Sequence, residues 1–123
     1  MGFSNRDRLR RKLKAIPVAV RKAAREQLKA NAKELVETQK SFAPVDDGKL
    51  RDSIKEQDVS TSTRISRRVS AGGREAPYAK WVEFGHGQAE PHPFFWPAYR
   101  LKRRRFRARM AKAAKKAIQG AAK

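Results

Sequence analysis

The chain has few large apolar side chains for its charge, and this limits the core that it can build by itself. Leucine, isoleucine, valine and phenylalanine make up 23 of its 123 residues, and the formal net charge is +19. Chains of such composition often remain disordered, but helical periodicity and two tryptophans argue against full disorder. We therefore expect one domain, over residues 1–123, that completes its core by burying surface against neighbouring subunits.

The positive charge lies in the two terminal segments. Residues 1–42 hold 12 Lys or Arg against 4 Asp or Glu, residues 43–99 hold 8 of each, and residues 100–123 hold 11 against none. A charge run is usually only a solvated face. The C-terminal segment, with 11 cations and no acid, nevertheless needs counter-charge to stay compact. DNA phosphate or an acidic partner protein could supply it.

Any DNA contact is expected to be phosphate-only and weakened by salt, because no helix-turn-helix, zinc-finger or RNP motif is present. The candidate contact residues are basic residues of the two expected terminal helices: Arg21, Lys22, Arg25, Lys29, Arg103, Arg104, Arg105, Arg107, Arg109 and Lys112.

Apolar spacing of three and four residues predicts helices at both ends of the chain. A short basic helix is expected over 6–16 and a long one over 17–42. Pro17 separates them, because proline disfavours helix in the preceding residue and suits the first helical position. A basic C-terminal helix is expected over 97–118.

The central segment predicts a small antiparallel sheet. Residues 49–71 have the pattern of a β-hairpin region, and 77–84 that of a short helix, with a strand as the second choice. Residues 85–96 are expected to be a loop. The fold class is therefore α+β, with the two long terminal helices packed on the sheet.

The central segment also contains predicted turn residues and a cluster of aromatic residues. Asp46, Asp47 and Gly48 predict a tight reversal, with positive φ at Gly48, and Gly85 predicts the end of segment 77–84. Six of the ten aromatics fall within residues 78–96. They belong to the core, to a subunit interface, or to both. The interface candidates are Tyr78, Trp81, Val82, Phe84, Phe94, Phe95 and Trp96.

No enzyme chemistry is predicted. Cysteine is absent, which excludes disulfides and Cys-based zinc sites. Glu83, His86, Glu90 and His92 do not match the helical His-Glu-x-x-His spacing, so we expect no catalytic residue, metal or cofactor. The chain has no 18-residue apolar run and no signal-peptide pattern, and we expect a soluble protein of the cytoplasm without membrane contact.

Three short stretches carry a resemblance to one family. They are APVDDGKLRDSI at 43–54, APYAKWVEFG at 76–85 and PFFWPA at 93–98. In this order, after a long basic helix, they resemble the siphophage tail-completion or neck (head–tail joining) proteins, which include lambda tail protein Z and related minor tail components. The likeness covers residues 10–110. It departs from the family pattern at Asp47, where Thr is usual, and at His86, where a small hydroxyl residue is usual.

The resemblance implies a structural subunit rather than an enzyme. It implies a homo-oligomeric ring, six-fold if it follows the tail, on the DNA path between capsid connector and tail. The implied partners are other copies of the chain, connector or head-closure proteins, tail-terminator or tail-tube proteins, and double-stranded DNA passing through. The implied location is the virion, after assembly in the host cytoplasm. The charge alone supports one alternative, a non-specific nucleic-acid-binding protein that acts outside a virion.

Overall fold

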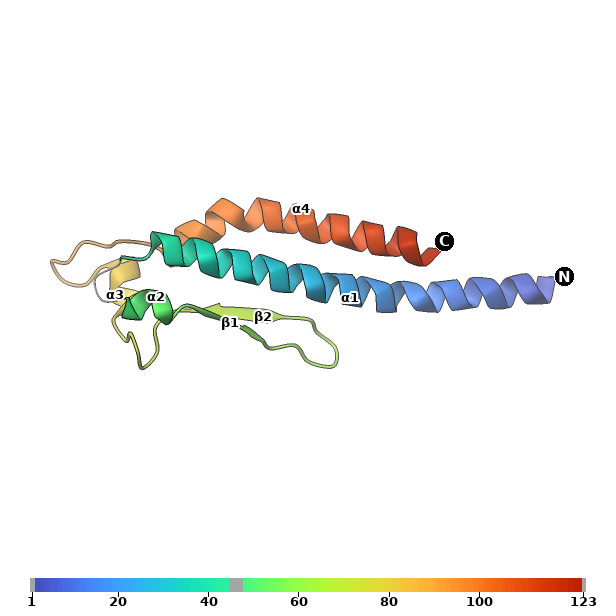
Figure 1. Cartoon of the computed structure of the whole chain (residues 1–123), viewed down its shortest axis with the longest axis horizontal. Helices are drawn as coiled ribbons and strands as arrows, with labels where there is room; N and C mark the ends of the chain where they lie inside the picture. Colours follow the sequence, from blue (N-terminus) through green and yellow to red (C-terminus); the bar gives the residue numbers. More distant parts are fainter. Residues whose placement is uncertain (1, 45–47, 123) are drawn as a thin grey trace.

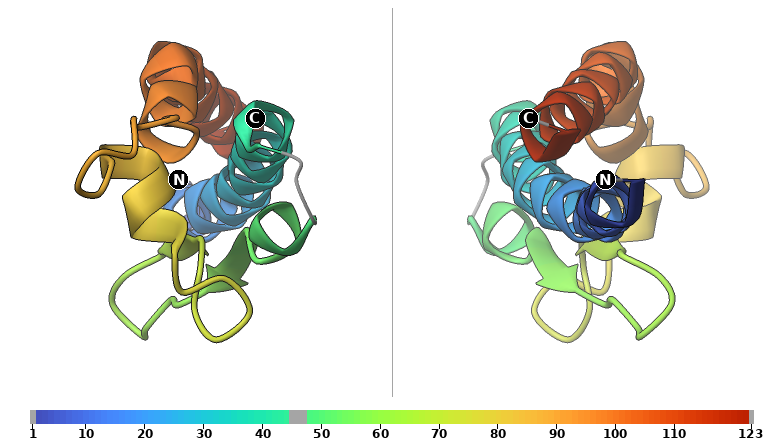
Figure 2. Two further views of the ribbon diagram at one scale, coloured as in Figure 1. Left: turned by 90° about the vertical axis from the view of Figure 1, so that its left-hand side faces the viewer. Right: turned by 90° about the vertical axis from the view of Figure 1, so that its right-hand side faces the viewer.

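The computed structural model describes residues 2–44 and 48–122, and it places side chains over 17–44 and 48–121. The elements are α1 (Gly2–Phe42), α2 (Lys49–Asp52), β1 (Lys55–Asp58), β2 (Arg67–Ser70), α3 (Ala79–Phe84) and α4 (Phe95–Ala122). Helices α1 and α4 run antiparallel side by side, and the N-terminal turns of α1 extend past the end of α4 (Figure 1). The hairpin lies on the other side of α1, so α1 is sandwiched between the hairpin and α4 (Figure 2).

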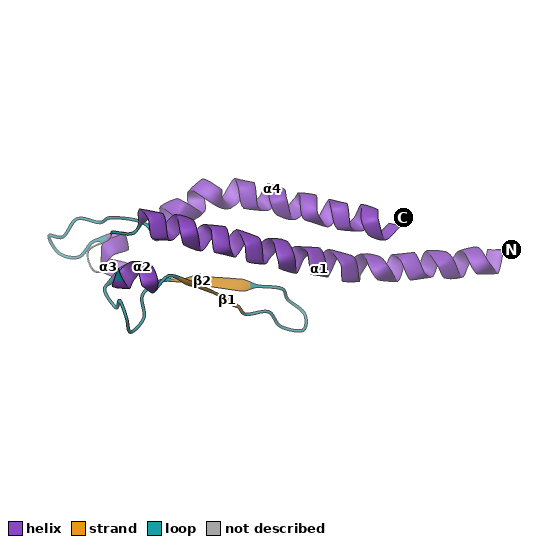
Figure 3. Cartoon of the chain, viewed as in Figure 1, coloured by secondary structure: helices purple, strands orange, loops and turns teal. Residues whose placement is uncertain are grey.

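This arrangement confirms the predicted α+β fold of two long terminal helices with a small antiparallel sheet (Figure 3). Strands β1 and β2 pair antiparallel, with Lys55 opposite Ser70 and Asp58 opposite Arg67. The segment that was expected to be a short helix or a strand is the helix α3. No helix in the described part of the chain is long and apolar enough to cross a membrane.

The predicted break at Pro17 was wrong. Helix α1 continues from Gly2 to Phe42 with Pro17 inside it, so the two expected helices are one, about 60 Å long. An interior proline lacks one helical N–H and crowds the carbonyl four residues earlier, at a cost of about 3 kcal/mol. Both sides of Pro17 are rich in Lys, Arg, Ala and Leu, whose summed helix propensity outweighs that single cost.

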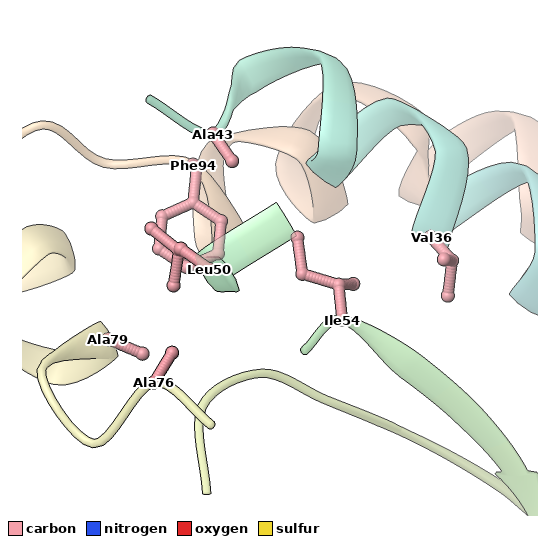
Figure 4. Packing of buried hydrophobic residues seen from close by; sticks show 7 residues of the cluster. All are labelled: Val36, Ala43, Leu50, Ile54, Ala76, Ala79 and Phe94. Atoms are coloured by element: carbon pink, nitrogen blue, oxygen red, sulfur yellow. The ribbon is translucent and has the colours of Figure 1, made fainter. Parts of the chain in front are cut away.

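The hydrophobic core lies at one end of the molecule, where the end of α1, helix α2, the segment before α3 and the start of α4 meet (Figure 4). Phe94 and Ile54 are its largest fully buried apolar side chains. Ser53 joins α2 to the segment after β2, because its Oγ donates to the carbonyl of Leu50 at 2.6 Å and accepts the N–H of Gly72 at 2.9 Å. The core members are Val36, Ala43, Leu50, Ile54, Ala76, Ala79 and Phe94.

Buried amides set the register between α1 and α4. Nε2 of Gln39, which is fully buried, donates to the carbonyl of Phe95 at 3.2 Å. Two turns earlier in α1, Nδ2 of the buried Asn31 donates to the carbonyl of Phe106 at 3.4 Å. A shift of α4 along α1 would leave these amides buried without acceptors, at about 1–3 kcal/mol each. The antiparallel pair is therefore held in one register by polar as well as apolar contacts.

The continuity of α1 predicts that Pro17→Ala stabilises the helix. The substitution restores one backbone N–H and removes the ring clash, so it should raise helix stability around residue 17 by up to about 3 kcal/mol. Amide hydrogen exchange over residues 13–21 would measure this as slower exchange. Ala30→Pro, at an exposed position within the same helix, is the opposite control and should destabilise. Unchanged exchange in Pro17→Ala would show that the helix is already interrupted there.

Candidate functional site

The buried carboxylate of Glu83 joins α3 to the start of α4. The backbone N–H groups of Phe94 and Phe95 donate to its Oε2 at 2.8 and 3.0 Å, and that of Trp96 donates to its Oε1 at 2.9 Å. The first four N–H groups of a helix have no partner within the helix. Glu83 accepts three of them, and the next residue, Pro97, has no N–H. The first turn of α4 is thus completely satisfied from outside the helix.

This cap explains why α4 begins at Phe95 rather than at Pro97, where the sequence predicted its start. The hydrogen bonds to the N–H groups of Phe95 and Trp96 hold these two residues in the helix, ahead of Pro97. The Glu83 carboxylate also interacts favourably with the positive end of the helix dipole. Because Glu83 lies on α3, the same interaction fixes the position of α3 against α4. Sequence reasoning considered Glu83 only as a possible site residue and missed its capping role.

The segment between α3 and α4 folds back on α3. Gly85 has a φ of +81°, and a Cβ there would lie 3.1 Å from the carbonyl oxygen of Ala89. The N–H of His92 donates to the carbonyl of Val82 at 2.7 Å. These contacts bring Phe94 to the end of α3, within reach of Glu83. The other predicted turn glycine, Gly48, has a φ of +77°, whereas Asp46 and Asp47 lie outside the described residues.

Three of the large aromatic side chains that remain exposed at this corner form what we call the aromatic surface: Trp81, Phe84 and Trp96. Their exposed fractions are 45%, 69% and 45%. The Trp81 ring stacks on His86 with centroids 4.7 Å apart, and Trp96 makes an edge contact with Tyr99 at 6.2 Å. A hollow of about 280 Å³ lies between Phe84 and Trp96. The aromatic surface is therefore partly packed against neighbouring rings and available for contact.

The remaining interface candidates lie inside the chain. Phe94 is a core residue with a 1% exposed fraction, so it cannot reach a second subunit in this fold. Tyr78, Val82 and Phe95 are half-buried against the core. The sequence pattern brought all seven candidates together at the α3–α4 corner, but it could not tell the core members from the exposed ones.

The basic candidates of α1 are all exposed, and their spacing places them in one broad stripe along the helix. Lys22 and Lys29 lie about half a turn from Asn31, which contacts α4, so they point away from α4. Arg25 lies on the hairpin side. Hydrogen bonds from Ser60, followed by the charges of Arg67 and Arg25, hold the pKa of the Asp58 carboxyl below its ordinary value of 3.8. Arg21 lies one turn before Arg25 on the same side.

The basic candidates of α4 also divide into two groups. Arg105 and Arg109 reach back to Glu34 of α1, with nitrogen–oxygen distances of 3.8 and 2.9 Å, so they hold the two helices together. Four others are exposed: Arg103, Arg104, Arg107 and Lys112. Of these, Arg103 and Arg107 line a groove between α1, β2 and α4.

No metal or acid–base site is assembled from the sequence candidates. Glu83 is committed to the α4 cap, and the ring of His86 stacks on Trp81. Glu90 and His92 are exposed. Over residues 2–44 and 48–122, no group of three or more His, Cys, Asp or Glu side chains could hold a metal ion.

The cap predicts that Glu83→Gln is strongly destabilising. A Gln amide offers one acceptor oxygen and an NH₂ group that cannot accept, so at least one buried N–H of α4 loses its partner. We expect a loss of about 2–4 kcal/mol in the free energy of unfolding, measured by urea denaturation. Glu90→Gln, at an exposed position of the following loop, makes the same chemical change and should stay within about 0.5 kcal/mol of the unmodified chain. Equal effects of the two substitutions would rule out the cap as a stabilising contact.

Comparison with known proteins identifies one family. The family described as "Bacteriophage HK97-gp10, putative tail-component" matches residues 7–85. Neither the curated proteins nor the solved structures give a match. The matched region includes nearly all of α1, the hairpin and α3, and it ends at Gly85. The family is a structural tail component rather than an enzyme class, which implies association with the virion and contact with other phage structural proteins. Because the match covers 79 of the 123 residues, the chain belongs to the HK97-gp10-like family of bacteriophage tail components.

Proposed function

We propose that this tail component is a neck or tail-completion subunit that forms a homo-oligomeric ring around the DNA path at the head–tail junction. The ring joins the capsid connector or head-closure protein to the tail-terminator or tail-tube protein, and the subunits assemble in the host cytoplasm. The aromatic surface at the α3–α4 corner is the observation that carries this proposal, because its large side chains stay exposed in a chain with a small core.

The aromatic surface has the properties of a subunit interface. Each large aromatic side chain buries about 150–250 Å² when covered, and Trp and Tyr are enriched among residues that dominate binding energy. The stacking of Trp81 on His86 and the edge contact of Trp96 with Tyr99 hold the rings in place before binding. Little side-chain freedom is then lost on association, which favours a tight contact.

A closed ring requires that each subunit presents two different surfaces to its two neighbours. The aromatic surface supplies one of them, at the end of the molecule where the core lies (Figure 1). The Glu83 cap fixes this surface relative to α4. The orientation of this interface therefore fixes the orientation of the long helices in the ring, and with it how the ring closes.

The outer face of α4 is the surface that best suits passing DNA. Arg100, Arg104 and Lys115 are exposed and lie between a third and half of a turn from Phe106, on the side away from α1. Helix α4 contains no acidic residue. Such a face attracts phosphates without reading bases, so a genome could slide past it.

The outward face of α1 suits DNA less well. Its exposed Lys22, Lys29 and Lys33 share that face with the exposed carboxylates of Glu26 and Glu37. These acids lower the local positive potential and would repel phosphate. Since the two basic faces point in opposite directions, one subunit turns only one of them toward the channel, and we assign the channel to α4.

The interface proposal predicts that Trp81→Asp combined with Phe84→Asp prevents ring formation. Native mass spectrometry of the subunit with its connector or tail partner should show a closed ring for the unmodified chain and monomer for the variant. Losing two central aromatic contacts costs about 2 kcal/mol or more each, or about thirtyfold per residue. Val18→Asp, on α1 at a 69% exposed position, is the control and should form rings normally. A stable monomer of the unmodified chain in the presence of both partners contradicts the ring.

The channel proposal predicts which cations set the salt dependence of DNA binding. Binding to a labelled duplex, measured over a range of salt concentrations, should lose about 2.7 from its logarithmic slope when Arg100, Arg104 and Lys115 are changed to Gln, at about 0.9 per phosphate contact. The matched variant, with Lys22, Lys29 and Lys33 changed to Gln, removes the same charge from α1 and should leave the slope nearly unchanged. Equal slopes for the two variants would mean that net charge alone binds DNA.

A further inference from the structure

We propose that the groove between α1, β2 and α4 is the binding site for an acidic amphipathic helix of another protein. The groove has a volume of about 360 Å³, and its floor is formed by apolar side chains from three elements, among them Leu28, Leu35, Val69, Phe106 and Met110. It lies on the flank of α4 that faces the hairpin. Neither the outward basic face of α4 nor the aromatic surface forms its floor.

The charges around the groove are all positive. Its charged lining residues are Arg67, Arg103 and Arg107, and the described lining contains no carboxylate. Arg67 is already neutralised within the hairpin by Glu56 and Asp58. Arg103 and Arg107 have no acidic partner among the residues whose side chains are placed. They are four residues apart, so they lie one turn apart along the same rim of α4.

The shape of the groove fits a short helix. Its α4 wall runs from Tyr99 to Met110, which spans about 17 Å at 1.5 Å per residue, or about three helical turns. An amphipathic helix buries apolar residues at i, i+3, i+4 and i+7 in such a groove. Carboxylates beside that apolar stripe would then meet Arg103 and Arg107 in charge-assisted hydrogen bonds.

Electrostatic repulsion disfavours a second copy of this chain as the occupant of the groove. The N-terminal part of α1, residues 2–16, carries six basic residues and one acid, and α4 carries no acid at all. Either helix would bring cations against Arg103 and Arg107, which is unfavourable in a partly buried contact. The occupant is therefore a different protein, with an acidic helix. This inference does not depend on the ring, because it rests on the groove alone.

A synthetic peptide tests the inference on the full-length protein. The probe is a helix of about 14 residues with Leu at i, i+3, i+4 and i+7 and Glu on its other faces. One comparison peptide has the same composition in scrambled order, and a second keeps the Leu stripe but carries Gln in place of Glu. The chain has two methionines, and Met110 lines the groove. The ¹³C-methyl signal of Met110, assigned through Met110→Leu, reports occupation of the groove directly.

We expect the acidic amphipathic peptide to shift the Met110 signal and to bind at least about tenfold more tightly than either comparison peptide. Arg103→Glu with Arg107→Glu should weaken this binding at least about tenfold. Arg104→Glu with Lys112→Glu makes the same change in net charge at exposed positions outside the groove lining, and should weaken it less than about twofold.

Two results would overturn the inference. In the first, all acidic peptides bind equally and the Met110 signal stays in place, so that only the overall charge of the protein attracts them. In the second, the Met110 signal shifts with protein concentration alone, so that a second copy fills the groove. Ring formation, followed by native mass spectrometry, is a separate readout. Failure of the groove inference is thus distinguishable from failure of the proposed ring.

Discussion

The hydrogen bonds between the Glu83 carboxylate and the first N–H groups of α4 are the contact on which the other features depend. They satisfy the N-terminus of α4 and fix α3 against it. Through α4 they also position Phe94 in the core and Phe95 opposite Gln39 of α1. A chain with few large apolar residues thus obtains a defined tertiary structure from buried hydrogen bonds as well as from its small core.

This construction leaves three surfaces with different chemistry. The aromatic surface, at the core end, offers large apolar area for protein contact. The outer face of α4 offers cations without acids, which suits phosphate. The groove between the long helices and β2 combines an apolar floor with two guanidinium groups that have no acidic partner among the placed side chains, which suits an acidic protein segment. The proposed position at the head–tail junction needs one surface for neighbouring proteins and another for DNA.

The sequence predicted the α+β fold and the basic terminal helices because these depend on local periodicity and composition. It failed at Pro17, because the helix propensities of the long flanking segments outweigh the cost of one interior proline. It missed the Glu83 cap because donor and acceptor are separated by a loop of irregular structure. It also could not separate the buried Phe94 from the exposed Trp96, because only tertiary packing around the start of α4 distinguishes them. The spacing of Arg109 from Phe106 was a usable signal that this arginine faces α1.

Electron cryomicroscopy of the assembled particle tests the central claim most directly, since it shows where this chain sits and what covers each of its surfaces. The account predicts a closed ring of this chain on the axis of the head–tail junction. In that ring, Trp81, Phe84 and Trp96 are covered by the neighbouring copy, and the outer face of α4 is turned to the DNA. A chain located away from the axis, or a ring in which the aromatic surface remains in solvent, would contradict it.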